Sequence, residues 1–580
     1  MKTLKELRIT PRNYLKNFNY FYIVILFLII IRFIAVFWNV DTYHEGDKYP
    51  SIIEMAQGGV IFRDVNHIYG FLMTIVNFPL VKVFGNYLIV TRLSGFIIQM
   101  LLVIVSYRLF KNFVSLSVSR NLTLLLLGIS NAWSWINPNI GASGNTWPTH
   151  YGMLFVSFSL LLIIKKPKSF KAEVVIFGIA GFLSAVAWSA RLEFITVWFL
   201  QTLAIAWIVF QYKSIKIQSL IIWLFGSAGY FSISLLLMQM SGSLEGWFEQ
   251  TIKVWFSEPP AQPSFNLGWL VINGFSFFAV MVLPVMIYLM SYQALKSKWN
   301  LAKLIFVISG IVILWFLIGV AFSDFTIGKY PVNAWVLGVI ERGLFGFASI
   351  FVCVFLLSLV FAKNKKIKKT YSALVVQDKS NFVIVGSTCA GLFSLFHIVN
   401  ADYLFMSITP FICFFLFAAG KLFPDYDKET FFKALNLSCK IIVILSVMLF
   451  VPKTVASDNY NYKTPLLKGM IDQDFDRGLR TDQNFYAIKK AIGSGKLWTF
   501  CVSGLYSVSD RGFISEDKWV WNLQPESWMA PRIEKPQTGD VMLVCNLSLG
   551  EKKIFDRRLA SGEFALLENL FGMDLFKVIK

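Results

Sequence analysis

The sequence predicts a polytopic α-helical membrane protein with about thirteen transmembrane helices and a C-terminal α/β domain. Its composition is the first indication, because 56% of the 580 residues are hydrophobic and only 15% are charged. Soluble domains carry about 25% charged residues. The second indication is that apolar runs of roughly twenty residues recur up to about residue 451, separated by short basic loops.

The net charge of +20 is distributed as a membrane topology requires. From residue 453 onward, 18 Lys and Arg stand against 16 Asp and Glu, whereas the rest of the chain carries 36 against 18. The excess lies in short loops between apolar runs, as the positive-inside rule describes for cytoplasmic loops. The charge therefore indicates topology and a lipid bilayer as partner, and we expect no binding of nucleic acid.

The first apolar run covers residues 21–40 and follows a basic segment. No small-residue cleavage site follows it, so we predict an uncleaved helix whose N-terminus is cytoplasmic. The next segment, residues 41–85, is then extracytoplasmic. It is rich in acidic residues, namely Asp41, Glu45, Asp47, Glu54 and Asp64.

Residues 67–84 are apolar but contain Pro79 and Lys82, and their length is marginal for crossing about 30 Å of hydrocarbon. We predict an interfacial or re-entrant helix here. The remaining spans then alternate so that every cytoplasmic loop is basic. These loops contain Arg108, Lys111 and Arg120; Lys165, Lys166, Lys168 and Lys171; Lys213 and Lys216; Lys296 and Lys298; and residues 363–369 and 421–433.

The chain divides into a transmembrane domain at residues 1–452 and a domain at residues 453–580, which the alternation places in the periplasm. This tail alternates strand-like runs with turn residues, which predicts an α/β fold. Cys501 and Cys545 each fall in such a run and are candidates for a disulfide bridge. The basic loops and the richness in Lys, Asn, Ile and Phe are typical of a bacterial inner-membrane protein.

The densest group of chemically active side chains follows the first helix directly. Asp41, His44, Glu45 and Asp47 lie within seven residues. Such a group can remove a proton from a hydroxyl. Its carboxylates, Asp41, Glu45 and Asp47, could alternatively hold Mg²⁺ or Mn²⁺. A solvated polar loop is the simpler interpretation, but the position at the end of a span favours function.

A series of motifs continues from this acidic segment. Met55 and Gly59 bound an M-x-x-G-G motif, and Phe62-Arg63-Asp64, Tyr69-Gly70, Phe84-Gly85 and Arg92-Leu93 follow in order. Over residues 21–110 this order resembles the GT-C glycosyltransferases, membrane enzymes that use polyprenyl-phosphate-linked sugars, such as lipid A aminoarabinose transferases and protein O-mannosyltransferases. The arrangement of about thirteen spans with an extracytoplasmic tail is also similar.

The resemblance implies transfer of a sugar from a polyprenyl-phosphate donor to a cell-envelope glycan or lipid acceptor on the extracytoplasmic face. It also implies that a carboxylate after the first helix is the catalytic base, which here is Asp41 or Glu45. Many relatives carry an Asp-Glu pair or Asp-x-Asp at this place, and this chain departs from both patterns. We expect Asp41 to be the base, because it is next to the end of the span.

A leaving phosphate requires fixed positive charge nearby. We expect the donor and acceptor to be bound by residues near extracytoplasmic ends of spans: His44, Asp47, Arg63, Arg92, Arg191, Glu193, Lys329, Arg342 and His397. Local ion pairs, such as Arg191 with Glu193, or snorkelling side chains are the alternative for these residues. Tryptophans in residues 144–150 and 245–260 suit sugar stacking, but an interfacial aromatic belt explains them more simply.

Two other functions fit a polytopic chain. An O-antigen polymerase also handles polyprenyl-linked glycans, but would place its key arginines in large loops in the middle of the chain. A glycan transporter or flippase would show paired halves and broken helices at corresponding positions. The sequence shows neither paired halves nor such broken helices, and its acidic cluster comes first in the chain, so a transferase is the favoured prediction.

Overall fold

A computed structural model describes residues 11–253 and 459–580, with gaps, and a few isolated positions between these ranges. The gaps are residues 43–44, 68, 137–146, 166–168, 193, 213–215, 473, 494, 501–503, 510, 517–529, 546, 548 and 571–572. The isolated positions are 326–327, 330–331, 386, 388, 440 and 443–444. The spans predicted after residue 253 and the domain boundary at 452 fall outside the described residues.

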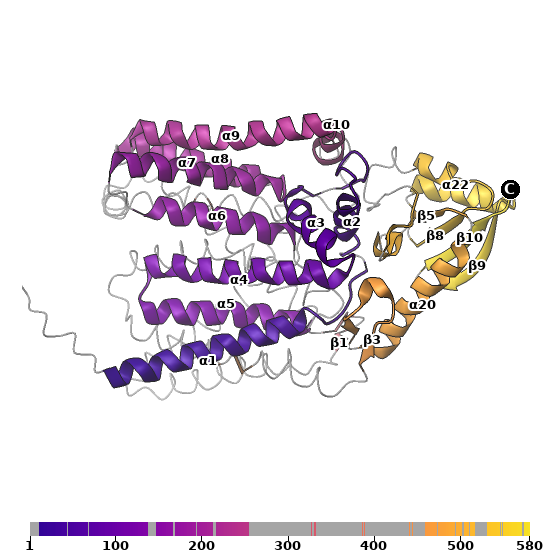
Figure 1. Ribbon diagram of the computed structural model, residues 1–580, viewed down its shortest axis with the longest axis horizontal. Helices are drawn as coiled ribbons and strands as arrows, with labels where there is room; N and C mark the ends of the chain where they lie inside the picture. The colour runs from indigo at the N-terminus through magenta and orange to yellow at the C-terminus, as the bar shows by residue number, and fades with distance from the viewer. Residues whose placement is uncertain are drawn as a thin grey trace, which may run out of the picture.

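Seven long, mainly apolar helices lie side by side in the first described range (Figure 1). They are α1 Pro11–Ala35, α4 Leu88–Phe113, α5 Leu116–Ile136, α6 Pro148–Ile164, α7 Phe170–Val186, α8 Phe194–Trp207 and α9 Ile217–Ser241. Three segments, Leu88–Phe113, Phe170–Ser189 and Ile217–Ser241, are long and apolar enough to cross a bilayer. Large apolar side chains such as Phe27, Ile104 and Phe225 are exposed, as lipid-facing residues are. The chain is thus a helical membrane protein.

The segment between α1 and α4 lies across one end of this bundle and contains two short helices, α2 Tyr49–Ala56 and α3 Leu72–Phe84 (Figure 1). The 13 residues of α3 rise only about 20 Å. That length is too short for a perpendicular span, which favours the predicted interfacial or re-entrant helix.

Hydrogen bonds join this segment to two other loops at the same end of the bundle. The Gly70 amide donates to the Ala190 carbonyl in the turn between α7 and α8. Gln250 accepts from the His67 amide and donates to the Phe62 carbonyl. Gln250 belongs to a π-helical turn, Phe248–Lys253, that follows α9 and the short α10 Leu244–Trp247. Three loops predicted to be extracytoplasmic therefore meet at one end.

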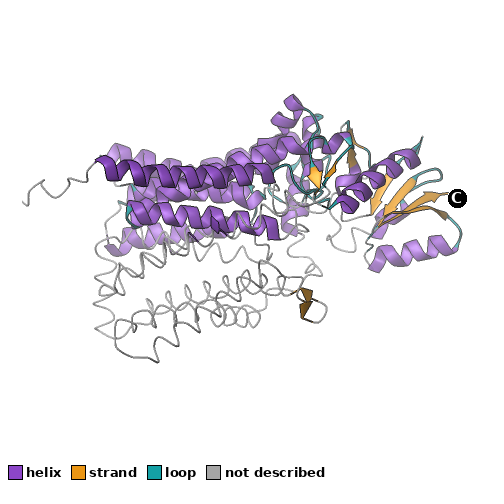
Figure 2. Ribbon diagram, turned by 90° about the horizontal axis from the view of Figure 1, so that it is seen from below, coloured by secondary structure: helices purple, strands orange, loops and turns teal. Residues whose placement is uncertain are grey.

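Residues 459–580 contain a four-stranded mixed sheet with strand order β5-β8-β10-β9 (Figure 2). Its strands are β5 Leu497–Phe500, β8 Val541–Val544, β9 Phe564–Leu570 and β10 Met573–Val578, of which β5 and β8 are parallel. Helix α20, Phe475–Ile492, packs Phe485 and Ile488 into the core that includes Leu543, and α22, Leu549–Ala560, packs Phe555 against Phe576. The elements are thus of the predicted α/β kind.

This region also contains two short antiparallel hairpins. One pairs β3 Tyr460–Asn461 with β4 Ile471–Asp472, and the other pairs β6 Val508–Ser509 with β7 Gly512–Phe513. A third hairpin, β1 Thr326–Ile327 with β2 Tyr330–Pro331, lies among the isolated positions. Cys545, directly after β8, is disulfide-bonded. The other five cysteines of the chain fall outside the described residues.

Helices α7 and α9 approach closely because glycines face each other. A Cβ built on Gly226 of α9 would lie 2.1 Å from the Gly178 carbonyl oxygen of α7. Ser227 donates to the Gly181 carbonyl across the same contact, 3.0 Å away. Small residues allow such an approach between membrane helices, where dispersion contacts and interhelical hydrogen bonds drive association.

We therefore expect Gly226→Ala to force the two helices apart and to lower stability by about 1–3 kcal/mol, as overpacking does. Gly229→Ala is the matched control, because nothing lies within 4 Å of a Cβ at that position of the same helix. Thermal unfolding of the purified proteins in detergent measures the stability of both variants against wild type. Equal melting temperatures for the two variants would contradict the packing described here.

Candidate active site

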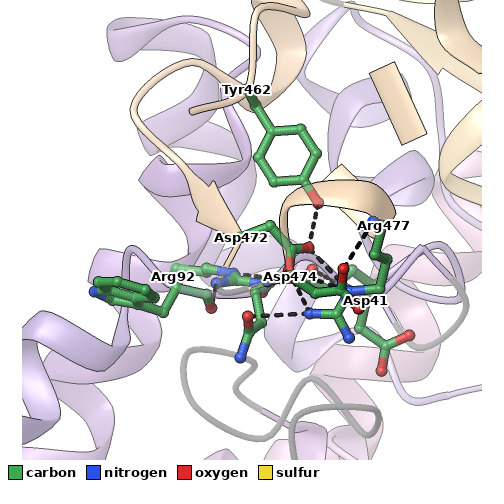
Figure 3. A network of polar contacts seen from close by, with 9 residues as sticks. Asp41, Arg92, Tyr462, Asp472, Asp474 and Arg477 are labelled. Atoms are coloured by element: carbon green, nitrogen blue, oxygen red, sulfur yellow. Dashed lines mark hydrogen bonds and ion pairs between the residues drawn. The ribbon is translucent and has the colours of Figure 1, made fainter. Parts of the chain in front are cut away.

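A buried arginine organises the chain where it leaves α1. Arg92 of α4, labelled in Figure 3, is 1% exposed. It forms a two-bond ion pair with Glu45. Its Nε donates to Glu45 Oε1 over 2.6 Å and its Nη2 to Oε2 over 2.8 Å. This is the geometry in which arginine binds a carboxylate most strongly.

The other N–H groups of Arg92 donate to backbone carbonyls after α1. Nη1 contacts the carbonyls of Val36 and Trp38 at 3.0 and 2.9 Å, and Nη2 also contacts that of Asn39. All five donors of the guanidinium are therefore used. Asn39 adopts a left-handed conformation with φ of 55°, which redirects the chain into the acidic segment.

Glu45 completes this arrangement by also accepting the backbone N–H of Asp41 over 2.9 Å. The Glu45 amide in turn donates to the Asp41 carbonyl over 3.0 Å. Glu45 is thus occupied by Arg92 and by the turn that contains Asp41. The arrangement suits a structural anchor, and the position of Asp41 depends on it.

The three carboxylates of the acidic segment lie in different environments. Asp41 and Asp47 are both buried, and Asp47 Oδ1 has no hydrogen-bond partner among the described residues. Burial raises the pKa of Asp47 well above its usual range; the Lys48 charge opposes this shift, and the Asp41 charge adds to it. Burial therefore opposes the ionisation of Asp47.

Two buried cations lie against aromatic rings beside these carboxylates. Lys48 Nζ is 3.4 Å from the centroid of the Trp147 ring, and Arg191 Cζ is 5.6 Å from that of Tyr69. The two rings contact each other edge to face at 6.3 Å. We call Lys48, Tyr69, Trp147 and Arg191 the cation–aromatic cluster. Its members come from three separate loops at one end of the bundle.

His67 adjoins this cluster, with its ring centroid 5.8 Å from that of Tyr69. Burial lowers its pKa to about 3, and the charge of Lys48 lowers the pKa further against the effect of the Gly70 backbone. Neither ring nitrogen has a side-chain hydrogen-bond partner that the structure describes. A buried neutral imidazole without a described side-chain partner, like the Asp47 oxygen, is the kind of group that binds a polar ligand.

A small pocket opens between the acidic segment and α4. Glu45, Lys48, Tyr49, Ile52, Met73, Leu88, Thr91 and Arg92 line it. The pocket has Lys48 and the Arg92–Glu45 pair on its polar side and apolar residues of α2, α3 and α4 on the other. This combination suits a ligand that has a charged group and an apolar part.

The predicted site residues separate into three groups. Asp41, Asp47 and Arg191 lie in or beside the buried region that contains the cation–aromatic cluster. Arg92 is bound to Glu45, and Arg63, whose side chain is 48% exposed, pairs with Asp64 and donates to the Ser241 carbonyl. His44, Glu193, Lys329, Arg342 and His397 fall outside the described residues.

The ligand set predicted for Mg²⁺ or Mn²⁺ is not assembled in the described part of the chain. No group of three or more His, Cys, Asp and Glu side chains there is placed to hold a metal ion. Both carboxylate oxygens of Glu45 are instead bound to Arg92. Trp147 is also not part of an interfacial belt, because it is only 2% exposed and lies beneath Lys48.

Sequence reasoning did not identify Lys48, Tyr69 or His67 as site residues. Their proximity to Arg191 depends on how three loops meet, and no local pattern indicates it. The one available signal was the lysine at position 48, a cation within an otherwise acidic segment.

No protein-family model matches the sequence, and no curated protein matches it. Among solved structures, the chain is similar to ArnT from Cupriavidus metallidurans bound to undecaprenyl phosphate, at 14% identity and a TM-score of 0.46, over 96% of this chain and 98% of that one. The chain is also similar to apo ArnT from the same organism, at 14% identity and a TM-score of 0.45, over 97% of this chain and 98% of that one. Because both TM-scores lie below 0.5, the functional proposal rests on the residues of the site.

The first prediction for this site concerns Arg92. We expect Arg92→Ala to cost about 3–5 kcal/mol, because it leaves the buried Glu45 carboxylate unpaired. Arg92→Lys should restore little of this lost stability, because an ammonium group cannot form the two parallel hydrogen bonds that a planar guanidinium makes with a carboxylate. Arg63→Ala, which removes a half-exposed pair, should cost about 0–1 kcal/mol. Thermal unfolding in detergent measures the stability of the three variants. Wild-type stability in Arg92→Lys would contradict the role of the Arg92–Glu45 pair as a structural anchor.

The second prediction concerns pH. Because folding raises the pKa of Asp47, the stability that its proton contributes is present below the unfolded value of 3.8 and is lost as pH rises through the folded pKa. Asp47→Asn should remove this loss, so the variant should be more stable than wild type above the folded pKa. Asp556→Asn, at an exposed position of α22, serves as the control. Parallel melting profiles of wild type and Asp47→Asn would show that Asp47 titrates normally.

Proposed function

We propose that the protein is an integral membrane glycosyltransferase of the GT-C type. It moves a sugar from a polyprenyl-phosphate donor to a hydroxyl of a cell-envelope glycan or lipid acceptor. The observation that supports this most is a buried carboxylate, Asp41, at the end of an apolar helix and electrostatically coupled to Asp47, which neighbours the cation–aromatic cluster. A base and fixed positive charge are the two requirements of glycosyl transfer with a phosphate leaving group.

Asp41 is the best candidate for the base because the neighbouring carboxylates are unsuitable. Both oxygens of Glu45 are occupied, by two charge-assisted bonds to Arg92 and by a backbone N–H, so Glu45 serves as a structural anchor. Asp47 is only 2% exposed against 8% for Asp41, and burial raises its pKa well above its usual range. Asp41 therefore takes the proton from the acceptor hydroxyl in the proposed reaction.

The bond changes then follow from the donor's chemistry. The acceptor oxygen forms a bond to the anomeric carbon as the bond from that carbon to the phosphate oxygen breaks. The polyprenyl phosphate leaves with the bonding electrons, so negative charge grows on its phosphate. Lys48 and Arg191 are placed to stabilise that charge in a buried region where water is scarce.

Neutral groups of the same region suit the sugar. His67 offers one ring N–H and one acceptor nitrogen, and the faces of Tyr69 and Trp147 are surfaces on which a sugar ring can pack. Exposed apolar side chains of α3, namely Ile75, Val83 and Phe84, provide a surface for the prenyl chain beside the pocket. We assign this end of the bundle to the periplasmic side of the inner membrane, because Lys111, Lys165 and Lys216 lie at the opposite ends of α4, α6 and α9.

The third prediction separates donor binding from catalysis. Asp41→Asn should bind undecaprenyl phosphate normally but lose sugar transfer by about 10²- to 10⁴-fold, the usual contribution of a general base. Lys48→Ala should weaken undecaprenyl phosphate binding by about ten- to a hundredfold, as expected for a lost charged hydrogen bond. Lys171→Ala, at an exposed position in the first turn of α7 and at the opposite end of the bundle, is the matched control.

Binding is measured by the shift of the melting temperature with undecaprenyl phosphate, and transfer by the release of polyprenyl phosphate from a panel of polyprenyl-phosphate sugars. Full transfer activity in Asp41→Asn would remove the proposed base. Donor binding by wild type without release of polyprenyl phosphate from any sugar donor, in the presence of cell-envelope acceptors, would favour a transporter or flippase.

A further inference from the structure

Hydrogen bonds connect the C-terminal α/β region to the backbone immediately before Asp41. The Asn39 N–H donates to the Ile471 carbonyl over 2.7 Å, and the Ile471 N–H donates to the Phe37 carbonyl over 2.8 Å. Trp38 and Ile471 accordingly form a parallel β-bridge. A strand from a position more than 400 residues later in the chain thus extends along the end of α1.

A buried ion pair holds this strand and contacts the same turn. Asp472 is 0% exposed and binds Arg477 of α20, with Nη2 2.7 Å from Oδ1 (Figure 3). Tyr462 and the Asp474 N–H also donate to the Asp472 carboxylate, at 2.7 and 2.9 Å. Arg477 Nη2 in addition donates to the Asn39 side-chain oxygen over 3.0 Å.

Asn39 is therefore held from two sides. Its carbonyl accepts from Arg92 of the membrane bundle, while its N–H and side chain bind Ile471 and Arg477 of the C-terminal region. Its left-handed φ of 55° is a conformation that asparagine tolerates better than most residues but that still needs support from its surroundings. Asp41 follows two residues later.

The C-terminal region also contacts the residue directly after Asp41. The Leu505 N–H approaches the Thr42 carbonyl at 3.4 Å, and the Tyr506 hydroxyl bonds to the Thr42 side chain. Gln57 at the end of α2 donates to the Arg511 carbonyl over 2.6 Å. The contacts from residues 471–511 therefore lie on both sides of Asp41 in the sequence.

From these contacts we infer that Arg477, supported by Asp472, is a positioning residue for Asp41, so that the C-terminal region is a part of the active site. This inference rests on the proposed function, in which Asp41 is the base. The physical basis is that a general base must lie within hydrogen-bond reach of the proton it takes. A displacement of about 1 Å can cost about 10² in rate.

The test compares Arg477→Ala with Arg477→Lys and with Lys489→Ala, an exposed position on the same helix. Arg477→Ala should lower kcat by about ten- to a hundredfold with an unchanged KM for the donor. Arg477→Lys should restore part of kcat, because it keeps the charge that pairs with Asp472. Lys489→Ala should match wild type. Hydrogen exchange at residues 37–42 should become faster in Arg477→Ala.

Asn39→Gly supplies a second variant that tests the same contact if Arg477→Ala folds poorly. Glycine keeps the left-handed backbone and both backbone hydrogen bonds, and removes the side chain whose oxygen Arg477 binds. Asn39→Gly and Arg477→Ala should be non-additive in kcat. In the Asp41→Asn background, Arg477→Ala should cause little further loss, since Arg477 acts through Asp41.

The outcomes separate this inference from the proposed function. An inactive Asp41→Asn with wild-type kcat in both Arg477→Ala and Asn39→Gly would overturn the positioning role alone. A rise in donor KM at unchanged kcat would also overturn it. Full activity in Asp41→Asn would instead overturn the catalytic base of the proposed function.

Discussion

The buried ion pair between Arg92 and Glu45 determines where the chain goes when it leaves the membrane. Burying two charges is unfavourable unless geometry and hydrogen bonding compensate. Here every N–H of Arg92 has a partner, and three of those partners are backbone carbonyls of residues 36–39. One side chain of α4 therefore fixes the end of α1 and the start of the acidic segment together. The positions of Asp41, of Lys48 and of the strand that binds Asn39 all depend on this junction.

The sequence is informative about features that short-range patterns encode. Apolar runs indicate α1, α4, α7 and α9 because a helix needs about 20 apolar residues to cross the hydrocarbon. The runs that become β5 and β8 are recognisable because their residues favour strands and turn residues bound them. The short α3 is indicated by its length and by Pro79. In each case the physical cause lies within a window of some twenty residues.

The site was predicted only in part because its chemistry depends on long-range contacts. Arg92 is a plausible phosphate ligand until Glu45, 47 positions earlier, is found to occupy it. Lys48 contacts Trp147 only because the N-terminal end of α6 packs against the acidic segment. The contact from Arg477 to Asn39 spans 438 positions. Such pairings follow from the packing of whole elements, so neither spacing nor composition reveals them.

The acidic segment also shows why residue type alone does not assign a role. Three carboxylates lie within seven residues, yet their surroundings divide them. Both oxygens of Glu45 are bound, to a guanidinium and to a backbone N–H, which suits a structural anchor. Burial instead raises the pKa of Asp47 well above its usual range. Asp41 follows two residues after Asn39, whose backbone and side chain are held by Arg92, Ile471 and Arg477. A fixed position within reach of the acceptor hydroxyl is what a general base requires, and these contacts supply it for Asp41.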